Sequence, residues 1–334
     1  MVDLNVSYLG LQLKNPLVAS ASPLSKKIDT VKQLEDAGIS AVVMYSLFEE
    51  QIVHESNELD FFLNRGTESY AEALTYFPDL SHYNVGSEGY LNTVRKLKES
   101  VDIPVIGSLN GYSTGGWLDY AKKIEQAGAD ALELNIYYLP AELETTSEEL
   151  EEAYIDLVSD VRKQVSIPLA LKLSPYFTAL PELASKLVAK GANGLVLFNR
   201  FMQPDLDIDQ MVVNPKVTLS TSQDLRLPLR WIALLYGRIQ ADLALTSGVH
   251  EVADVVKAIM AGANVAMMAS ELLEKGPGRA AELLKGLQEW LEAKEYDSVQ
   301  QMCGSMSQKA VADPTSFERA NYMKALSSYD DRLP

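Results

Sequence analysis

The sequence predicts a (β/α)8 TIM barrel, in which a closed ring of eight parallel strands is surrounded by helices. Eight short apolar runs are distributed along the 334 residues, and amphipathic helical stretches separate most of them. A junction of helix, glycine and apolar run recurs four times. The apolar runs lack clean alternation, which is typical of strands that are covered on both faces.

The recurring junction predicts four helices, each followed by a buried strand. It has the sequences EDAGISAVV (35–43), EQAGADALEL (125–134), VAKGANGLVL (188–197) and IMAGANVAMM (259–268). Glycine ends a helix readily because it adopts the left-handed conformation without a side-chain clash.

Four further apolar runs complete the predicted ring. They are NPLVASAS (15–22), IPVIGSLN (103–110), IPLALKLSP (167–175) and ADLALTSG (241–248). Proline opens two of these strands, where it is tolerated. The eight strands centre near residues 19, 43, 107, 133, 171, 197, 244 and 267, with helices such as 117–128 and 180–191 between them.

The remaining segments are predicted to extend one domain, residues 1–334. Residues 4–15 alternate like a β-hairpin and are expected to plug the bottom of a barrel that spans about 15–275. Residues from about 277 to 334 are predicted to form a C-terminal helical extension of two helices. An open doubly wound sheet is the alternative fold, but no GxGxxG turn follows the first strand.

Two connections are long, an aromatic-rich one at 61–86 and another at 202–228. Long excursions in a compact barrel are usually functional loops or lids. Both leave the C-terminal ends of strands, where barrel enzymes carry their active sites.

Composition excludes several classes of function. The net charge of −17 repels phosphate backbones, so we expect no nucleic-acid partner. We also expect no membrane span and no secretory signal, and the single Cys303 fits a reducing cytoplasm. The acidic run 144–154 is interpreted as the solvated start of a helix.

Three polar side chains are predicted to converge at one barrel mouth. Lys172 lies within a strongly apolar strand, and Asn135 and Asn199 stand near the same level on neighbouring strands. A buried lysine needs a partner, so a structural ion pair with Glu133 is one interpretation. A site for a polar planar ligand is the other.

Small residues at the last two strand ends predict a phosphate site. TSGVH (246–250) and MMASELL (267–273) place them where a strand becomes a helix, at the usual phosphate position of this fold. A plain turn is the alternative. The three histidines show no metal-ligand spacing, so we expect no metal site, and Cys303 is interpreted as structural.

In this combination the sequence resembles the class 1 dihydroorotate dehydrogenase family over about residues 3–275. The resemblance rests on the hairpin and NPLVASAS, then PVIGSLNG, ADALELN, PLALKLSP, the asparagine after strand 6, and the last two turns. It implies an FMN cofactor, a small-molecule substrate, pyrimidine metabolism, and a cytoplasmic homodimer that in some relatives joins an iron–sulfur subunit. This chain has no four-cysteine cluster motif, so such a centre would belong to a redox partner.

The resemblance also implies roles for individual residues. Those expected to bind the cofactor are Ser20, Ala21, Asn110, Asn135, Lys172, Gly248, Val249, Ala269 and Ser270. Those expected to bind the substrate are Asn135, Asn199, Arg200 and Tyr45.

Departures from the family pattern lie mostly on the substrate side. In ELNIYYLP (133–140), Tyr138 stands where the family has its catalytic cysteine base. Tyr45 replaces a lysine and Arg200 follows Asn199. The glycine-rich turn is replaced by LSTSQ (219–223), and the substrate loop is only echoed in YNVGSEG (83–89). Tyrosine, with a pKa of about 10, is a poor base unless a cation such as Arg200 lowers that pKa.

Three hypotheses follow for the function. The first is an FMN-dependent oxidoreductase that transfers hydride between a dihydroorotate-like substrate and flavin, with Tyr138 at the catalytic position. The second is a non-catalytic flavin-binding barrel or a subunit of a larger redox complex. The third is an aldolase-like barrel that uses Lys172 as a Schiff base.

Overall fold

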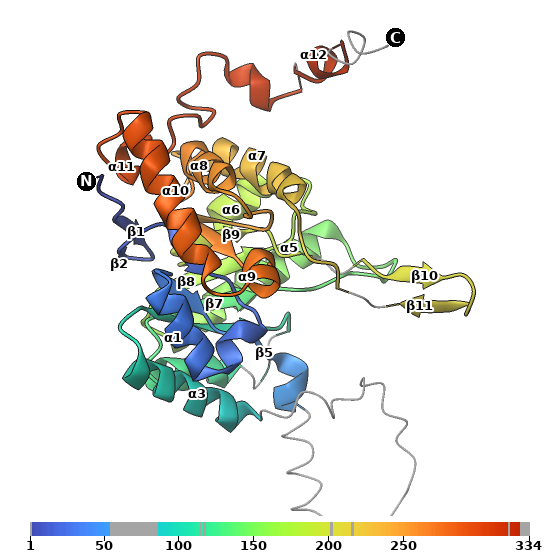
Figure 1. Cartoon of the computed structure of the whole chain (residues 1–334). Helices are drawn as coiled ribbons and strands as arrows, with labels where there is room; N and C mark the ends of the chain where they lie inside the picture. Colours follow the sequence, from blue (N-terminus) through green and yellow to red (C-terminus); the bar gives the residue numbers. More distant parts are fainter. Residues whose placement is uncertain are drawn as a thin grey trace, which may run out of the picture.

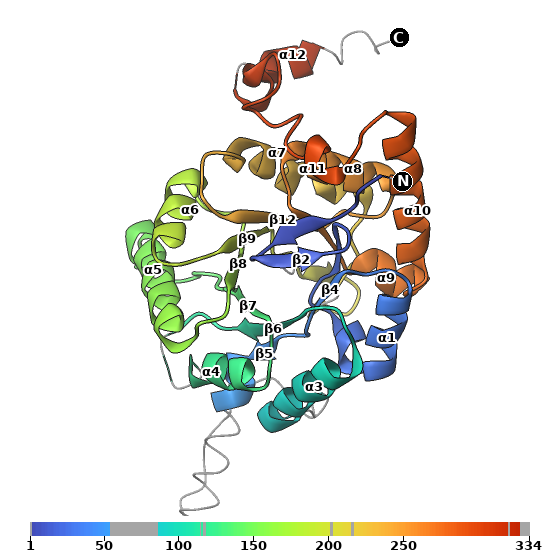
Figure 2. The same cartoon turned by 90° about the vertical axis from the view of Figure 1, so that its left-hand side faces the viewer.

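Eight parallel strands close into a ring in the computed structural model of the chain (Figures 1 and 2), which confirms the predicted barrel. The structure describes residues 2–53, 86–113, 115, 118–200, 203–214, 217–319 and 321–327. In ring order the strands are β3 (Leu17–Ala19), β4 (Ala41–Val43), β6 (Val105–Asn110), β7 (Ala131–Asn135), β8 (Leu169–Leu173), β9 (Gly194–Leu197), β12 (Asp242–Thr246) and β13 (Val265–Met268). β13 pairs with β3 to close the ring, and the short β5 (Leu47–Phe48) pairs with the end of β6.

Helices surround this ring (Figure 2). They are α1 (Ile28–Asp36), α3 (Ser87–Ser100), α4 (Asp119–Gln126), α5 (Ser147–Gln164), α6 (Leu180–Ala189), α7 (Arg226–Leu235), α8 (Val252–Ala261), α9 (Ser270–Lys275) and α10 (Arg279–Ala293), with the 3-10 turns η1 (Pro23–Lys26) and η4 (Ser222–Leu225). The predicted helix–glycine–strand junctions are confirmed, because all four glycines have positive φ. At Gly262 packing also requires glycine, since a Cβ would lie 2.3 Å from Cδ2 of Tyr236.

The acidic run at 144–154 begins α5, as predicted. The Thr146 side chain accepts a hydrogen bond from the backbone N–H of Glu149, and the Glu149 carboxylate accepts one from the backbone N–H of Thr146. This reciprocal capping box satisfies two backbone donors at the helix start. The acidic composition of the run therefore has a structural explanation.

The N-terminal hairpin closes the bottom of the barrel, as predicted (Figure 2). It consists of β1 (Val6–Tyr8) and β2 (Leu11–Leu13), and Leu9 at its tip is buried. The Leu9 backbone N–H donates to Oδ2 of Asp242 at 2.6 Å. Nδ2 of Asn264 donates to Oδ1 of the same carboxylate at 3.0 Å. Asp242 therefore joins the hairpin to the start of β12.

The ring of helices extends beyond the predicted barrel limit near residue 275. α10 packs against α8, and its Leu284 lies at the end of α1, where a Cβ on Gly38 would come within 2.5 Å of Cδ1. The tail then forms α11 (Val299–Met302), η5 (Pro314–Phe317) and α12 (Asn321–Ser327), which is more than the two helices predicted. Residue Asp3 bridges to Ser298 and so ties the N-terminus to this tail.

The long connection at 202–228 carries an exposed antiparallel hairpin, β10 (Asp205–Asp207) and β11 (Val212–Asn214), which projects from the barrel in Figure 1. Its continuation forms η4 and enters α7. The other long connection, 61–86, lies outside the described residues except for its last position. Among the helices that the structure describes, none is long and apolar enough to cross a membrane.

Replacing Asp242 with alanine is expected to destabilise the fold, because the Leu9 N–H and the Asn264 amide lose their acceptor. We expect the free energy of unfolding to fall by about 2 kcal/mol. Urea denaturation followed by circular dichroism measures this change. Asp36→Ala, at an exposed position of α1, is the matched control and should change stability by less than about 0.5 kcal/mol. Equal stability of the two variants would contradict the role of Asp242.

Candidate active site at the barrel mouth

Three polar side chains stand at one level where strands β6, β7 and β8 end. The parallel register pairs Asn110 with Asn135, and Asn135 with Lys172. All three are buried. Asn199 follows β9, and its Nδ2 donates to Oδ1 of Asn135. The predicted convergence of Asn135, Lys172 and Asn199 on one mouth is therefore what the barrel register produces.

Lys172 forms a buried ion pair with Glu133. Its Nζ lies 3.5 Å from Oε1 of Glu133 and 3.5 Å from Oγ of Ser20. The Glu133 side chain is fully buried, and its Oε2 has no hydrogen-bond partner among the described residues. The ion-pair interpretation is thus realised. It does not conflict with a ligand role, because the Lys172 ammonium also faces a cavity.

A cavity of about 240 Å³ lies above Lys172, and we call it the Lys172 cavity. The predicted site residues that line it are Ser20, Ala21, Lys172, Asn199, Arg200, Gly248, Val249, Ala269 and Ser270. Hydroxyl groups of Ser22, Ser220 and Thr246 add to this lining. A second cavity of about 300 Å³ shares Phe198, Asn199 and Arg200 with it and extends to Tyr176. Together the two cavities form a cleft over the C-terminal ends of the strands.

Tyr45 is predicted to bind substrate, but the structure does not bring it to the cleft. Its ring packs edge-on against Tyr90 of α3, with ring centroids 5.0 Å apart. Its backbone N–H donates to Oγ of Ser25, and Nζ of Lys26 lies over its ring. Tyr45 does not line either cavity, because its ring packs toward the surrounding helices.

Tyr138 is half-buried near the start of the loop that follows β7. Its ring stacks on Tyr112 with centroids 4.6 Å apart, and its hydroxyl donates to Oε2 of Glu142 at 3.3 Å. Loss of hydration and the neighbouring Glu142 carboxylate both raise the pKa of Tyr138 above its usual value. The expectation that Arg200 could lower this pKa is wrong, because the Arg200 guanidinium bonds to the carbonyl of Thr218. Tyr138 is therefore a neutral phenol at physiological pH.

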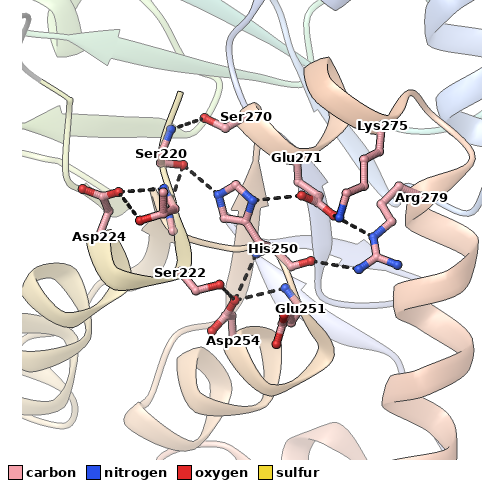
Figure 3. Close-up of polar contacts among 12 residues, drawn as sticks. Ser220, Ser222, Asp224, His250, Glu251, Asp254, Ser270, Glu271, Lys275 and Arg279 are labelled. Atoms are coloured by element: carbon pink, nitrogen blue, oxygen red, sulfur yellow. Dashed lines mark hydrogen bonds and ion pairs between the residues drawn. The ribbon is translucent and has the colours of Figure 1, made fainter. Parts of the chain in front are cut away.

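Ser220 and His250 form a contact that sequence reasoning missed (Figure 3). Oγ of Ser220 lies 3.0 Å from Nε2 of His250, and Nδ1 of His250 lies 2.9 Å from Oε2 of Glu271. The backbone N–H of Ser220 also donates to Oγ of Ser270 at 3.0 Å. A histidine directly after the SGV turn was the available signal. The spacing of the histidines in the sequence does not reveal this contact, because Ser220 lies on another connection.

Glu271 is the centre of an ion-pair cluster. Nζ of Lys275 and Nε of Arg279 lie 3.0 and 2.7 Å from its Oε1. Burial raises the pKa of its carboxyl, but hydrogen bonds from Lys275, His250 and Arg279 outweigh this effect and leave the pKa lowered. His250, Glu271 and Glu274 offer possible metal-ligand atoms within 4.8 Å of one another. Both oxygens of Glu271 already have partners, so we assign no metal to this group.

Comparisons with known proteins relate the chain to one family. The family model described as dihydroorotate dehydrogenase matches residues 64–291. The chain is 25% identical to the catalytic subunit of dihydroorotate dehydrogenase B (NAD(+)) from Thermoplasma volcanium, over 91% of this chain and 98% of that protein. The proteins of the same name from Thermoplasma acidophilum and Methanothermobacter thermautotrophicus are 26% and 23% identical, over 91% and 90% of this chain and 99% and 97% of their own lengths.

Replacing Glu133 with glutamine is expected to lower the free energy of unfolding by about 3 kcal/mol, because the Lys172 ammonium is left buried without its counter-charge. The double variant Glu133→Gln, Lys172→Met should lose less than the sum of the two single variants, which a denaturant double-mutant cycle measures.

The exposed pair Glu182 and Lys186 on α6 provides the matched control cycle. Its coupling should not exceed about 0.5 kcal/mol, as for other surface pairs. Additive effects at Glu133 and Lys172 would contradict the buried ion pair.

Proposed function

The chain belongs to the dihydroorotate dehydrogenase family of oxidoreductases, and from that membership we propose that it binds FMN in the Lys172 cavity. FMN would supply a hydride acceptor for a dihydroorotate-like substrate, which amino-acid side chains cannot provide. The proposal rests on the observation that Lys172, Ser20 and the turns after β12 and β13 line one and the same cavity. This function is favoured over a flavin-binding barrel without catalysis.

The lining of the Lys172 cavity fits a flavin nucleotide at both ends. Gly248, Val249, Ser220 and Ser270 form one end, which we call the hydroxyl end, and its backbone and hydroxyl groups suit a phosphate. At the other end Lys172 suits the electron-rich edge of a flavin ring. Gly248 has φ +78°, and a Cβ there would lie 2.2 Å from the backbone N of Leu225. Glycine therefore lets the turn pack closely against η4 beside the hydroxyl end.

Lys172 is proposed to hold and polarise the flavin ring. Glu133 and Ser20 fix the position of its ammonium from below and from the side. A fixed cation at this point stabilises negative charge that develops on a ligand above it. Membership of an oxidoreductase family favours this role over the aldolase-like one, in which Lys172 would form a Schiff base.

The amides of Asn135 and Asn199 are proposed to bind the substrate. Since Nδ2 of Asn199 donates to Oδ1 of Asn135, the pair still offers both amide donors and amide acceptors to a ligand. A cyclic ureide such as dihydroorotate carries both kinds of group on one edge. Arg200, which lines both cavities, supplies a positive charge for a substrate carboxylate.

Electron transfer beyond the flavin is proposed to involve a partner subunit. The relatives named above are catalytic subunits, and their printed names include NAD(+). Because this chain carries one cysteine, an iron–sulfur centre would have to belong to such a partner. We also propose that the chain forms a homodimer, in keeping with the family resemblance.

Purified protein is expected to carry a yellow flavin that dihydroorotate bleaches in the absence of oxygen. Lys172→Met should weaken FMN binding by roughly ten-fold or more, because a charged contact to the ring is lost. Quenching of FMN fluorescence measures the affinity. Lys186→Met, on the exposed face of α6, is the control and should bind like the parent protein. Undiminished FMN binding by Lys172→Met would count against the assigned cavity.

Substrate oxidation that uses Tyr138 as the base is expected to accelerate with pH. A base acts in its deprotonated form, and the pKa of Tyr138 is raised above its usual value. The rate of anaerobic flavin bleaching should therefore rise about ten-fold per pH unit between about pH 7 and pH 9. Stopped-flow absorbance measures this rate.

Tyr138→Cys should move the rising limb toward about pH 8.5, and Tyr138→Phe should abolish it. A flavin-loaded Tyr138→Cys variant that dihydroorotate does not bleach would mean that the substrate pocket has diverged as well as the base. A limb that persists in Tyr138→Phe would exclude Tyr138 as the base.

A further inference from the structure

Three side chains form a relay behind the hydroxyl end of the Lys172 cavity (Figure 3). Glu271 contacts Nδ1 of His250, and Nε2 of His250 contacts Oγ of Ser220, which lines the cavity. His250 itself does not line the cavity. Its hydrogen-bonded connection to a ligand there therefore runs through Ser220.

The charge on Glu271 fixes the hydrogen-bond direction at one side of the imidazole. The lowered pKa of Glu271 keeps its carboxylate ionised, and an ionised carboxylate can only accept hydrogen bonds. Nδ1 of His250 must therefore carry a proton and donate to Glu271. The protonation state of His250 is then decided at Nε2, the atom that faces Ser220.

The Ser220 hydroxyl can donate one hydrogen bond and accept two, and its contacts within the protein use all but one of these. One lone pair accepts from the backbone N–H of Gly248 at 3.4 Å. If His250 is neutral, its Nε2 accepts the Ser220 proton, and the free capacity of Ser220 toward the cavity is a lone pair. If His250 is protonated, its Nε2 donates to the second lone pair, and the free capacity is the O–H donor.

We propose that His250 is a positioning residue for the phosphate of the cofactor, and that its protonation turns the Ser220 hydroxyl from an acceptor into a donor toward that phosphate. The oxygens of a phosphate dianion can only accept hydrogen bonds, so the donor state of Ser220 binds them and the acceptor state repels them. Binding of the phosphate is then linked to the uptake of one proton at His250. This inference rests on the proposed FMN function.

The surroundings of His250 hold the imidazole in place and set its electrostatic field. From α8, Oδ2 of Asp254 accepts from the backbone N–H of His250 at 3.2 Å and of Glu251 at 3.0 Å. From α10, Arg279 donates to the His250 carbonyl at 3.2 Å. The charged groups that face this region are Asp224 of η4, Glu251, Asp254 and Lys257 of α8, Glu271, Glu274 and Lys275 of α9, and Arg279 and Glu282 of α10.

These charges act on the imidazolium in both directions. Glu271 and Asp254 place negative charge beside it, and Lys275 and Arg279, which pair with Glu271, place positive charge beside it. A phosphate bound in front of Ser220 would add negative charge on the Nε2 side of the ring.

The test compares FMN with riboflavin, which has the same ring system but no phosphate. Affinities for the full-length apoprotein are measured by flavin fluorescence quenching between about pH 5.5 and about pH 8.5, the range in which histidines titrate. We expect the affinity for FMN to fall by roughly ten-fold toward high pH, because a donor to a charged group is lost. The affinity for riboflavin should stay constant.

The direction in which FMN affinity changes with pH distinguishes the effect of His250 from the ionisation of the FMN phosphate itself. A phosphate monoester loses its second proton near about pH 6 and becomes more negative as pH rises. That ionisation strengthens binding to donors at high pH, whereas deprotonation of His250 weakens it. A decrease in FMN affinity with pH therefore cannot come from the phosphate alone.

Two variants test the relay itself. His250→Gln places an amide that can donate to Ser220 at every pH, so the loss of FMN affinity toward high pH should disappear while binding persists. Ser220→Ala should also remove the pH dependence and bind FMN weakly throughout. Ser222→Ala is the matched control, because Ser222 bonds to Asp254 and not to the imidazole, and it should retain the parent pH dependence.

The outcomes distinguish the relay from the proposed function. FMN affinity that is flat or rises with pH in the parent protein, or that falls equally in His250→Gln, would overturn the relay and leave the FMN site in place. Failure of both FMN and riboflavin to bind at every pH would overturn the proposed cofactor, and the relay with it.

Discussion

A charged lysine inside a closed parallel barrel is the constraint on which the site depends. Lys172 and Asn135 are register partners, and Glu133 lies one layer below them on the same face of β7. The carboxylate therefore sits beneath the ammonium, and the cavity lies above it. Below Glu133, Tyr8 of the hairpin is fully buried, and the Glu133 and Asp242 carboxylates add to the effect of burial in raising its pKa. The barrel bottom and the ligand site are thus parts of one column of polar groups.

The two sides of the cleft are built in different ways. The hydroxyl end is held by α8, α9 and α10, whose side chains form the cluster around Glu271 and His250. Tyr138 and Tyr112 lie in loops after β7 and β6, where they stack on each other, and Tyr112 is 45% exposed. Buried networks fix atoms more closely than exposed loops do. The hydroxyl end is accordingly more fully determined by the fold than these loops are.

Particular elements explain which predictions succeeded. The apolar runs and junction glycines predicted all eight strands because burial on two faces and helix termination are local properties of a sequence. A helix was predicted where α10 lies, but not its packing against α8, because an amphipathic pattern does not say which neighbours a helix packs against. Tyr45 was placed at the mouth by resemblance, but its ring turns to Tyr90. A side chain just beyond a strand can face either way, and only its neighbours decide the direction.

The sequence by itself determined the barrel, the hairpin that closes its bottom, and the strand positions of Lys172, Asn135 and Asn199. The two-residue period of strands and the glycines at helix ends can both be recognised directly in the sequence. It also placed a tyrosine, Tyr138, at the position where the family resemblance implies a cysteine. Only the tertiary structure decided that loss of hydration and the Glu142 carboxylate raise the pKa of Tyr138 and that His250 stands behind Ser220. Glu142, Ser220 and His250 lie on different connections around the mouth, and Glu271 lies in α9. The physical reason is that the direction of a hydrogen bond and the pKa of a side chain depend on which segments lie side by side. Segments this far apart in the sequence meet only when the ring of strands closes.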